Sequence, residues 1–326
     1  MKAQATTAVT SASANTPASD GGSGFTPDMP VAPAADSDGG HKARPTAENN
    51  GQASAAPALR GHLHLAAATR ANGETYLARQ SFRAPFHLSK PYWDGRALHV
   101  QLVNSTAGIL AGDELDLDLA AEPGAALAVT TPAAARAFMM QSGAARCRQR
   151  FAVGAGAWLE YAPEALYPHR ETDYAQHTRL ELAAGATTLF TDQLAPGRVG
   201  RGECWAWRRL RIGLDVFLDG RLLLREQLDA SGAELARLAA FHGMSEAWFG
   251  TAVIAVPTLT ADAPVWAQLR ALHRDGCLCG VTALAPGVWI VRLVASGGLA
   301  LRDTFAALRA ALAPALPGLQ ADLRKL

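Results

Sequence analysis

The sequence has few of the residues on which several common functions depend. Only four of its 326 residues are lysine, and none of these lysines follows a glycine. A nucleotide-binding P-loop requires Gly-Lys-Ser/Thr, because its lysine reaches the phosphates at the start of a helix. This motif is therefore excluded. The H-E-x-x-H and G-x-S-x-G motifs of metalloproteases and serine hydrolases are also missing.

Long apolar runs, a charge imbalance and a regular cysteine pattern are absent as well. No apolar run reaches the roughly 20 residues of a membrane-spanning helix, and none follows Lys2 as in a secretory signal. The formal net charge of +1 favours neither nucleic acid nor a membrane surface as partner. The four irregularly spaced cysteines do not form a disulfide framework. We therefore expect a cytoplasmic protein.

The composition divides the chain near Leu59. Residues 1–58 are mostly Ala, Ser, Thr, Gly, Pro and Asp, and such a segment buries too little apolar surface to offset its ordering entropy. We predict a disordered tail here and a folded domain over residues 59–326. Within that domain, residues 59–230 have strand patterns and residues 231–326 an α/β pattern.

The predicted β core contains one clear hairpin and one recurrence. Apolar residues alternate over 210–218 and 222–228 around Asp219-Gly220, which suits the positive φ angles of a tight turn. Strand, glycine turn and strand then recur around Gly124, Gly156 and Gly185. Spacings of about 30 residues indicate stacked, solenoid-like β layers, although three ordinary hairpins give the same pattern.

After Asp229 the pattern changes to mixed helix and strand. Helical spacing predicts helices over residues 233–242, 263–274 and 299–312, and alternation predicts strands over 281–283 and 288–294. The fold class expected is therefore mainly β, with a stacked-sheet, solenoid-like core and an α/β C-terminal part that carries a few helices.

Two carboxylates flank an unusual glycine- and arginine-rich segment, residues 192–203. Strands are predicted on both sides of it, so the segment brings Asp192 and Glu203 near each other, with Arg198 and Arg201 between them. Two facing carboxylates bind a divalent cation or share a proton. The alternative is an ion-pair network that stiffens the turn. Asp113, in a second small-residue turn, is a candidate for metal or partner contact, or simply a turn residue.

Other candidates are a loop and two histidine groups. The Pro- and Tyr-rich residues 161–170 suit a protein contact, or else fix this loop to its own core. His62 and His64 share one face of a predicted strand, as metal ligands or as a solvated pair. The second histidine group consists of His273, Cys277 and Cys279. A structural zinc site normally needs four ligands, so we favour a core strand for the two cysteines.

Several segments together resemble the UreD (UreH) family of urease accessory proteins. The order and spacing of these segments match those of the family's motifs, from about Arg60 to the C-terminus. The segments are residues 108–113, 130–136, 159–164, 176–178, 192, 196–198 and 202–203. Residues 104–108 lack the prolines and paired glycines that the family often has before the Gly-Asp turn. Residues 135–138 lack its usual Lys and Tyr. These departures affect partner details more than membership.

The resemblance implies a non-enzymatic metallochaperone or scaffold that is required for nickel insertion into apo-urease. The implied partners are apo-urease, a helical accessory protein of the UreF type and a nickel-carrying GTPase of the UreG type. The resemblance further implies that no cofactor is stably bound and that nickel passes transiently through internal passages. We expect Asp113, Asp192 and Glu203 to line or support a passage, because isolated carboxylates release nickel more readily than a thiolate cage.

The resemblance also suggests partner contacts, and two other functional classes remain open. We expect the loop residues Tyr161, Tyr167, Arg170 and Glu171 to bind partners. One alternative is a metal-dependent hydrolase that uses Asp192, Glu203 and a histidine. The other is a passive β-rich protein-binding module. Neither alternative explains the ordered series of segments.

Overall fold

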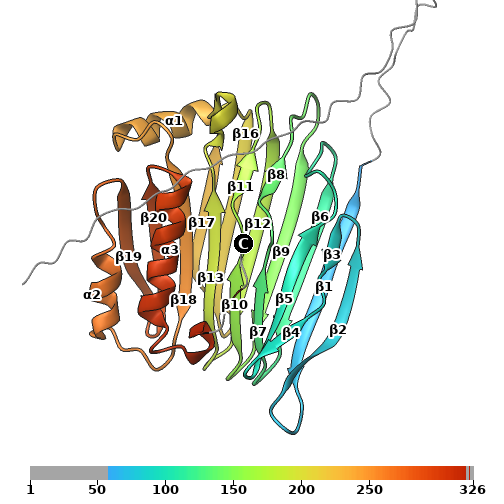
Figure 1. The fold of residues 1–326 in the computed structure, drawn as a ribbon, viewed down its shortest axis with the longest axis vertical. Helices are drawn as coiled ribbons and strands as arrows, with labels where there is room; N and C mark the ends of the chain where they lie inside the picture. The colour runs from blue at the N-terminus through green and yellow to red at the C-terminus, as the bar shows by residue number, and fades with distance from the viewer. Residues whose placement is uncertain (1–57, 321–322, 324–326) are drawn as a thin grey trace, which may run out of the picture. The chain divides into compact units, whose positions relative to one another are not determined.

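The structure, a computed structural model, describes residues 58–320 and Leu323 (Figure 1). The chain divides into two units, residues 1–54 and 55–326, and every described residue belongs to the second. The predicted disordered tail, residues 1–58, lies outside the described residues except for Ala58.

Most of the described chain forms two β-sheets. The seven-stranded sheet has the order β17 (Arg221–Ala230), β16 (Arg209–Leu218), β12 (Asp173–Leu182), β9 (Ala145–Val153), β6 (Glu114–Ala121), β1 (Arg60–Thr69) and β2 (Thr75–Arg83). The main path of the eleven-stranded sheet is β19 (Cys277–Ala285), β20 (Val288–Ala295), β18 (Trp248–Ala255), β13 (Thr187–Leu194), β10 (Trp158–Ala162), β7 (Ala126–Thr130), β5 (Ala97–Asn104) and β3 (Phe86–Leu88). The fold is mainly β, as predicted.

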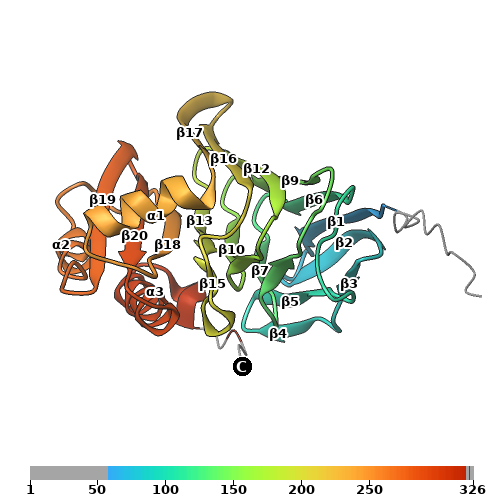
Figure 2. The same cartoon turned by 90° about the horizontal axis from the view of Figure 1, so that it is seen from above.

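The recurrent glycine turns join strands of different sheets, so the layers form a solenoid. β6, β9 and β12 are parallel neighbours in one sheet, and β7, β10 and β13 are parallel neighbours in the other. Figure 2 shows the two sets lying opposite each other. The turns themselves stack, because the Gly124 N–H donates to Ala155 O at 3.1 Å and the Gly156 N–H to Gly185 O at 3.2 Å. All three glycines have positive φ. The alternative of three ordinary hairpins is therefore wrong.

Several short strands lie off the main path of the eleven-stranded sheet, and β14 and β15 form a separate small ribbon. β8 (Ala135–Ala137) pairs in parallel with β11 (Leu166–Pro168), and β11 pairs with the end of β13. β4 (Tyr92–Asp94) pairs with β5. The ribbon consists of β14 (Gly197–Arg198), the 3₁₀ turn η1 (Val199–Arg201) and β15 (Glu203–Cys204). None of these short elements was predicted, because three residues are too few to show a period.

Antiparallel strands flank the solenoid layers at both ends. The predicted hairpin is confirmed as β16 and β17, with φ of 48° at Asp219 and 75° at Gly220. β18 pairs antiparallel with β13 and continues into β20 and β19. β19 and β20 confirm the predicted strands around Pro286-Gly287, whereas β18 was not predicted.

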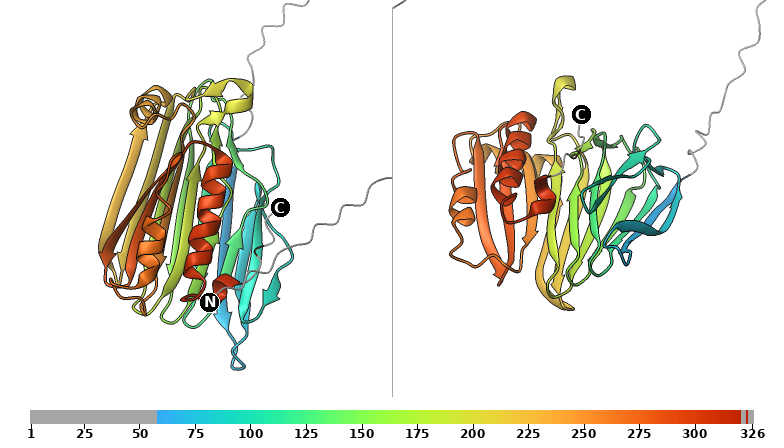
Figure 3. Two further views of the ribbon diagram at one scale, coloured as in Figure 1. Left: turned by 60° about the vertical axis from the view of Figure 1, so that its left-hand side comes forward. Right: turned by 60° about the horizontal axis from the view of Figure 1, so that its bottom comes forward.

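Three α-helices follow the β core: α1 (Gly232–Phe241), α2 (Pro264–Arg270) and α3 (Gly298–Leu312), with a final 3₁₀ turn η2 (Pro317–Gln320). All three predicted helices are present, and α2 ends four residues early because the chain turns into the Arg274–Cys277 bridge. A capping box between Ser231 and Glu234 fixes the start of α1. Figure 3 shows α3 lying along the outer face of the second sheet.

The apolar core has two main parts. The larger cluster fills the space between the sheets and includes Leu119, Phe151 and Leu159, which are fully buried. The second cluster joins the outer face of the eleven-stranded sheet to α2 and α3, where Trp266 stacks on Trp289 at a centroid distance of 3.9 Å. No helix among the described residues has the length and apolar character that a bilayer-spanning segment requires.

Candidate functional site

A belt of polar side chains interrupts the core between the two sheets. These residues lie on three strands between the larger apolar cluster and a third cluster around Leu115, Leu194 and Leu210, to which Cys147 and Tyr174 also belong. The interrupting positions are Cys147 and Gln149 on β9, Tyr174, Gln176 and Thr178 on β12, and Asp192 on β13. An inward-facing strand position is normally apolar. This polar belt is therefore the most unusual feature of the interior.

The members of the polar belt are joined by hydrogen bonds. The Gln176 amide donates to Asp192 Oδ2 at 2.9 Å, and the Tyr174 hydroxyl donates to Gln176 Oε1 at 3.1 Å. On the neighbouring strands, Thr178 donates to Gln149 Oε1 at 3.2 Å, and the Gln149 amide lies 3.7 Å from Cys147 Sγ. The belt thus presents amide oxygens, one carboxylate and one thiol, which are all possible metal ligands.

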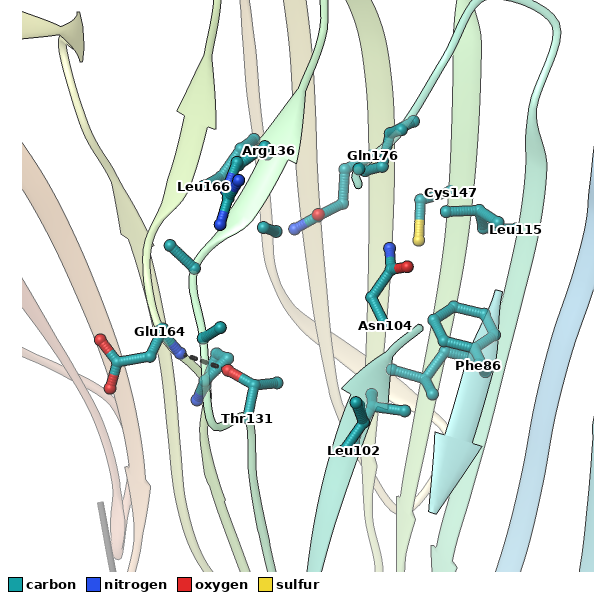
Figure 4. A pocket seen from close by; sticks show the side chains of 18 of the residues that line it. Phe86, Leu102, Asn104, Leu115, Thr131, Arg136, Cys147, Glu164, Leu166 and Gln176 are labelled. Carbon is teal, nitrogen blue, oxygen red and sulfur yellow. Dashed lines mark hydrogen bonds between the residues drawn. The ribbon is translucent and has the colours of Figure 1, made fainter. Parts of the chain in front are cut away.

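Two cavities meet at the polar belt. The first, of about 180 Å³, lies under residues 104, 106–109 and 131–136, and Figure 4 shows Asn104, Cys147 and Gln176 projecting into it from different strands. The second, of about 280 Å³, lies between β16–β17, β18, β20 and α1. Leu166, Gln176 and Asp192 line both cavities. The Gln176–Asp192 pair therefore stands at the junction of two internal spaces.

Asp192 is a desolvated carboxylate that accepts hydrogen bonds from two neutral groups. Its Oδ1 accepts from the Gln193 backbone N–H at 2.9 Å, and its Oδ2 accepts from Gln176. Burial raises the pKa of the carboxyl from 3.8 to about 6, although both hydrogen bonds act in the opposite direction. The side chain keeps intermediate exposure because it lines the cavities. A passing cation would therefore meet an ionisable group from which little water has to be removed.

The other two predicted metal residues lie elsewhere. Among the described residues no three of His, Cys, Asp and Glu are placed to hold a metal ion together, so Asp113, Asp192 and Glu203 do not form one site. Asp113 is buried, and its carboxylate accepts the backbone N–H groups of Leu59 at 3.0 Å and Leu110 at 2.8 Å. Asp113 thereby shapes the turn over residues 108–112, part of which covers the first cavity.

Glu203 belongs to an ion pair on the β14–β15 ribbon. Arg198 donates to its two carboxylate oxygens at 2.6 to 2.9 Å, and the Arg170 backbone N–H lies 3.4 Å from Oε2. The Arg198 hydrogen bond holds the pKa of Glu203 below its ordinary value. Glu203 thus has the turn-stiffening contacts that the sequence left open as an alternative, whereas Asp192 lies within strand β13 and outside this network.

The predicted partner-binding residues fall into two groups. Tyr161 lies in β10 and is 5% exposed, with its ring stacked on Phe190 at 5.4 Å, so it fixes this segment to the core as in the alternative interpretation. Tyr167 is half-buried against Trp248. Arg170 and Glu171 are exposed, and Glu171 has a φ of 57°. Of these four residues, only Arg170 and Glu171 are exposed to a partner.

The histidine and cysteine candidates have ordinary structural partners. His62 shares a face of β1 with His64, and their Nε2 atoms lie 2.8 Å from Ser81 Oγ and 3.5 Å from Asp116 respectively. Cys277 Sγ lies 3.2 Å from Thr304 Oγ1, and Cys279 Sγ donates to Leu269 O at 3.3 Å. The two thiols therefore contact α3 and α2, which agrees with the predicted core strand.

Reasoning from the sequence missed most of the polar belt. Cys147 and Gln149 on β9 and Tyr174 on β12 occupy alternate inward positions, and both strands continue with apolar inward residues such as Phe151 and Leu180. A polar residue at an inward position of two neighbouring solenoid strands was the available signal. That signal identifies a site only when the parallel register is known, because the register pairs Cys147 with Gln176 and Gln149 with Thr178.

Gly108 permits a close approach at the mouth of the first cavity. A Cβ atom at this position would lie 2.4 Å from Arg136 O, an atom that also accepts the Ile109 N–H at 2.7 Å. We expect Gly108→Ala to lower the free energy of unfolding by more than about 1 kcal/mol, measured by chemical denaturation. Gly200→Ala is the matched control because the space around Gly200 is open. Equal stability of the two variants would contradict the close packing.

Comparison with known proteins gives the family. The family described as UreD urease accessory protein matches residues 59–326. A relative named urease accessory protein UreD from Opitutus terrae is 52% identical over 254 residues, which cover 77% of this chain and 93% of the relative. Urease accessory protein UreD 2 from Streptomyces griseus is 31% identical, over 77% of this chain and 89% of the relative. A UreD from Herpetosiphon aurantiacus is 30% identical, over 70% and 79%. The chain belongs to the UreD family of urease accessory proteins.

Proposed function

We propose that the chain is a metallochaperone and scaffold that is required for the insertion of nickel into apo-urease. Membership of the UreD urease accessory protein family carries this proposal. The proposal gives the chain no catalytic step of its own. Nickel is the cargo and is held only transiently, so no stably bound cofactor is part of the proposal.

The meeting of two cavities at Asp192 supports a route for nickel through the interior. A conduit has to bind its ion weakly enough to release it, and carboxylate and amide oxygens are weaker ligands for nickel than a set of thiolates or imidazoles. Asp192 and Gln176 offer such oxygens where the two cavities meet. We therefore assign Asp192 to the wall of the passage.

Asp113 and Glu203 have supporting roles in this proposal. Both oxygens of Asp113 accept backbone N–H groups, and the turn that they shape covers the first cavity. Glu203 is held by Arg198 and stiffens the β14–β15 ribbon. Neither carboxylate lines the two cavities at their junction, so their loss acts through the shape of the protein.

The proposed partners are apo-urease, a helical accessory protein of the UreF type and a nickel-carrying GTPase of the UreG type. Arg170 and Glu171 are the proposed contact residues because they are exposed beside the ribbon. Tyr167 is half-buried and offers part of its side chain, and Tyr161 acts from within the core. The same proposal places the protein in the cytoplasm, in keeping with its four free cysteines.

Two alternatives make different demands on the structure. A metal-dependent hydrolase that uses Asp192, Glu203 and a histidine requires them in one site, whereas Asp192 lies between the sheets and Glu203 pairs with Arg198 on the ribbon. A passive binding module requires no polar junction between internal cavities. The metallochaperone explains both the family and the junction, so we favour it.

The nickel content of urease from cells that lack only this protein tests the proposal. We expect folded, nickel-poor and inactive urease, restored by re-expression of the chain. Fully loaded and active urease would overturn the proposed function. Turnover of a substrate by the purified chain without partners would favour the hydrolase.

The supporting role of Glu203 gives a prediction about its ion pair. We expect Glu203→Ala and Arg198→Ala to impair urease activation to the same extent, because each removes the bidentate pair, and each to destabilise the ribbon by about 1 kcal/mol. Nickel per urease and proteolysis of the ribbon are the measurements. Arg201→Ala, an exposed change on the same ribbon, is the control. Loss of activation in the Glu203 variant alone would instead indicate metal contact.

A further inference from the structure

The polar belt contains one sulfur, and it lies next to the junction of the two cavities. Cys147 on β9 faces Gln176 on β12 directly in the parallel register, and both side chains point inward. Gln176 in turn donates to Asp192 Oδ2 at 2.9 Å. One side chain therefore separates the thiol from the carboxylate, and all three residues line the first cavity.

Figure 4 shows two of these three side chains, Cys147 and Gln176, at the first cavity. The sulfur of Cys147 and the amide of Gln176 project into the same space, with the Asn104 amide below them. Cys147 is 6% exposed, and the described contacts of its sulfur are the Gln149 amide at 3.7 Å and the Tyr174 hydroxyl. A thiol needs no such polar surroundings to pack in a core, where free cysteine behaves as a small apolar residue.

We propose that Cys147 and Asp192 together form a holding station for a borderline divalent transition-metal ion, with amide oxygens of the belt completing the ligand set. This inference rests on the proposed function, because it names the atoms that would hold the ion on its way between the cavities. It goes further by adding a sulfur ligand to a passage that was expected to offer only oxygens.

A sulfur ligand gives the station a preference among metals. Mg²⁺ and Ca²⁺ take oxygen ligands almost exclusively, whereas Ni²⁺, Co²⁺ and Zn²⁺ accept thiolate. The abundant hard cations therefore gain nothing from Cys147. A mixed set of one sulfur, one carboxylate and neutral amides favours a nickel-like ion and still lacks the strength of a closed thiolate site.

Binding at the station involves one proton. The ion bonds to the sulfur as the S–H bond breaks, and the proton passes to water in the cavity. When the ion leaves, the thiolate takes a proton back. Burial raises the pKa of the Cys147 thiol to about 11, so at neutral pH the proton competes with the ion. That competition weakens binding relative to a thiolate that is already ionised, which suits a station that has to release its ion.

Spectroscopy of the purified full-length chain with Co²⁺ as probe tests the station. Thiolate bound to Co²⁺ gives a charge-transfer absorption band in the near ultraviolet, which oxygen ligands do not give. We expect the band in the unmodified chain and in the control Cys204→Ser, whose cysteine lies on the β14–β15 ribbon. We expect no band in Cys147→Ser or Cys147→Ala, and at least tenfold weaker Co²⁺ and Ni²⁺ binding in Asp192→Asn.

The outcomes separate this inference from the proposed function. Absence of the band in the unmodified chain, or its survival in both Cys147 variants, would overturn the station. Unchanged metal affinity in Asp192→Asn would also overturn it. Fully loaded urease in cells without the protein would overturn the proposed function but leave the band and its dependence on Cys147 unaffected. Circular dichroism of each variant verifies that the fold is retained.

Discussion

Asp192→Asn is expected to reduce the nickel content and activity of urease at least tenfold when it replaces the natural chain in cells. The carboxylate lines both cavities and supplies the ionisable oxygen at their junction. Asparagine keeps the shape but has a single carboxamide oxygen, so the variant removes the charge and one of the two hydrogen bonds that Asp192 accepts. Urease nickel per protomer, determined by elemental analysis, is the measurement.

The same variant is expected to be more stable than the natural chain above about pH 6. The folded-state pKa of Asp192 is about 6, above its ordinary value of 3.8. The stability that comes from binding this proton is therefore fully present below pH 3.8 and lost as the pH rises through 6. One pKa unit corresponds to about 1.4 kcal/mol, so Asp192→Asn should avoid a charge-burial penalty on the order of 3 kcal/mol at pH 8. The lost hydrogen bond offsets about 1 kcal/mol of that gain.

Chemical denaturation at pH 5 and pH 8 measures how the stability gain of Asp192→Asn depends on pH. The difference in stability between Asp192→Asn and the natural chain should grow from pH 5 to pH 8. Asp303→Asn, on the exposed face of α3, is the control and should change neither stability nor urease loading. A variant that loses stability at both pH values would show that Asp192 is a structural residue and not part of a passage.

Arg309→Ala is expected to destabilise the fold by about 3–5 kcal/mol, the usual effect of breaking a buried ion pair. Glu160 on β10 is fully buried, and it accepts hydrogen bonds from Arg309 on α3 at 2.7 and 3.1 Å. This pair joins the last helix to a solenoid strand. For a domain of this size, each kcal/mol lowers the melting temperature by about 2–4 °C.

Thermal unfolding checks the prediction, with a fall on the order of 10 °C expected for Arg309→Ala. Arg302→Ala on the same helix removes a side chain that is 69% exposed and lies 3.7 Å from Asp303, so the melting temperature of this variant should stay within about 2 °C of that of the natural chain. Similar shifts for both variants would mean that the buried pair does not hold α3 to the sheet.

Local patterns in the sequence determined much of the fold. Alternation over residues 210–228 with Asp219-Gly220 is sufficient to specify β16 and β17, because turn geometry and strand period act within a few residues. The glycines at 124, 156 and 185 marked the solenoid layers, since each turn needs a positive φ. The apolar spacing of residues 299–312 likewise predicted α3.

The tertiary structure alone decided the candidate site. Asp192 and Glu203 are eleven positions apart and were expected to face each other. In the structure, Asp192 on strand β13 accepts a hydrogen bond from Gln176 between the sheets, whereas Glu203 on the β14–β15 ribbon pairs with Arg198. Glu160 and Arg309 are 149 positions apart and form a buried pair. Cys147, Gln176 and Asp192 come together through strand register and hydrogen bonding between sheets. The periodicity of a sequence indicates which face of a strand or helix is buried. Which other side chains that face contacts depends on long-range strand pairing, which no local pattern encodes.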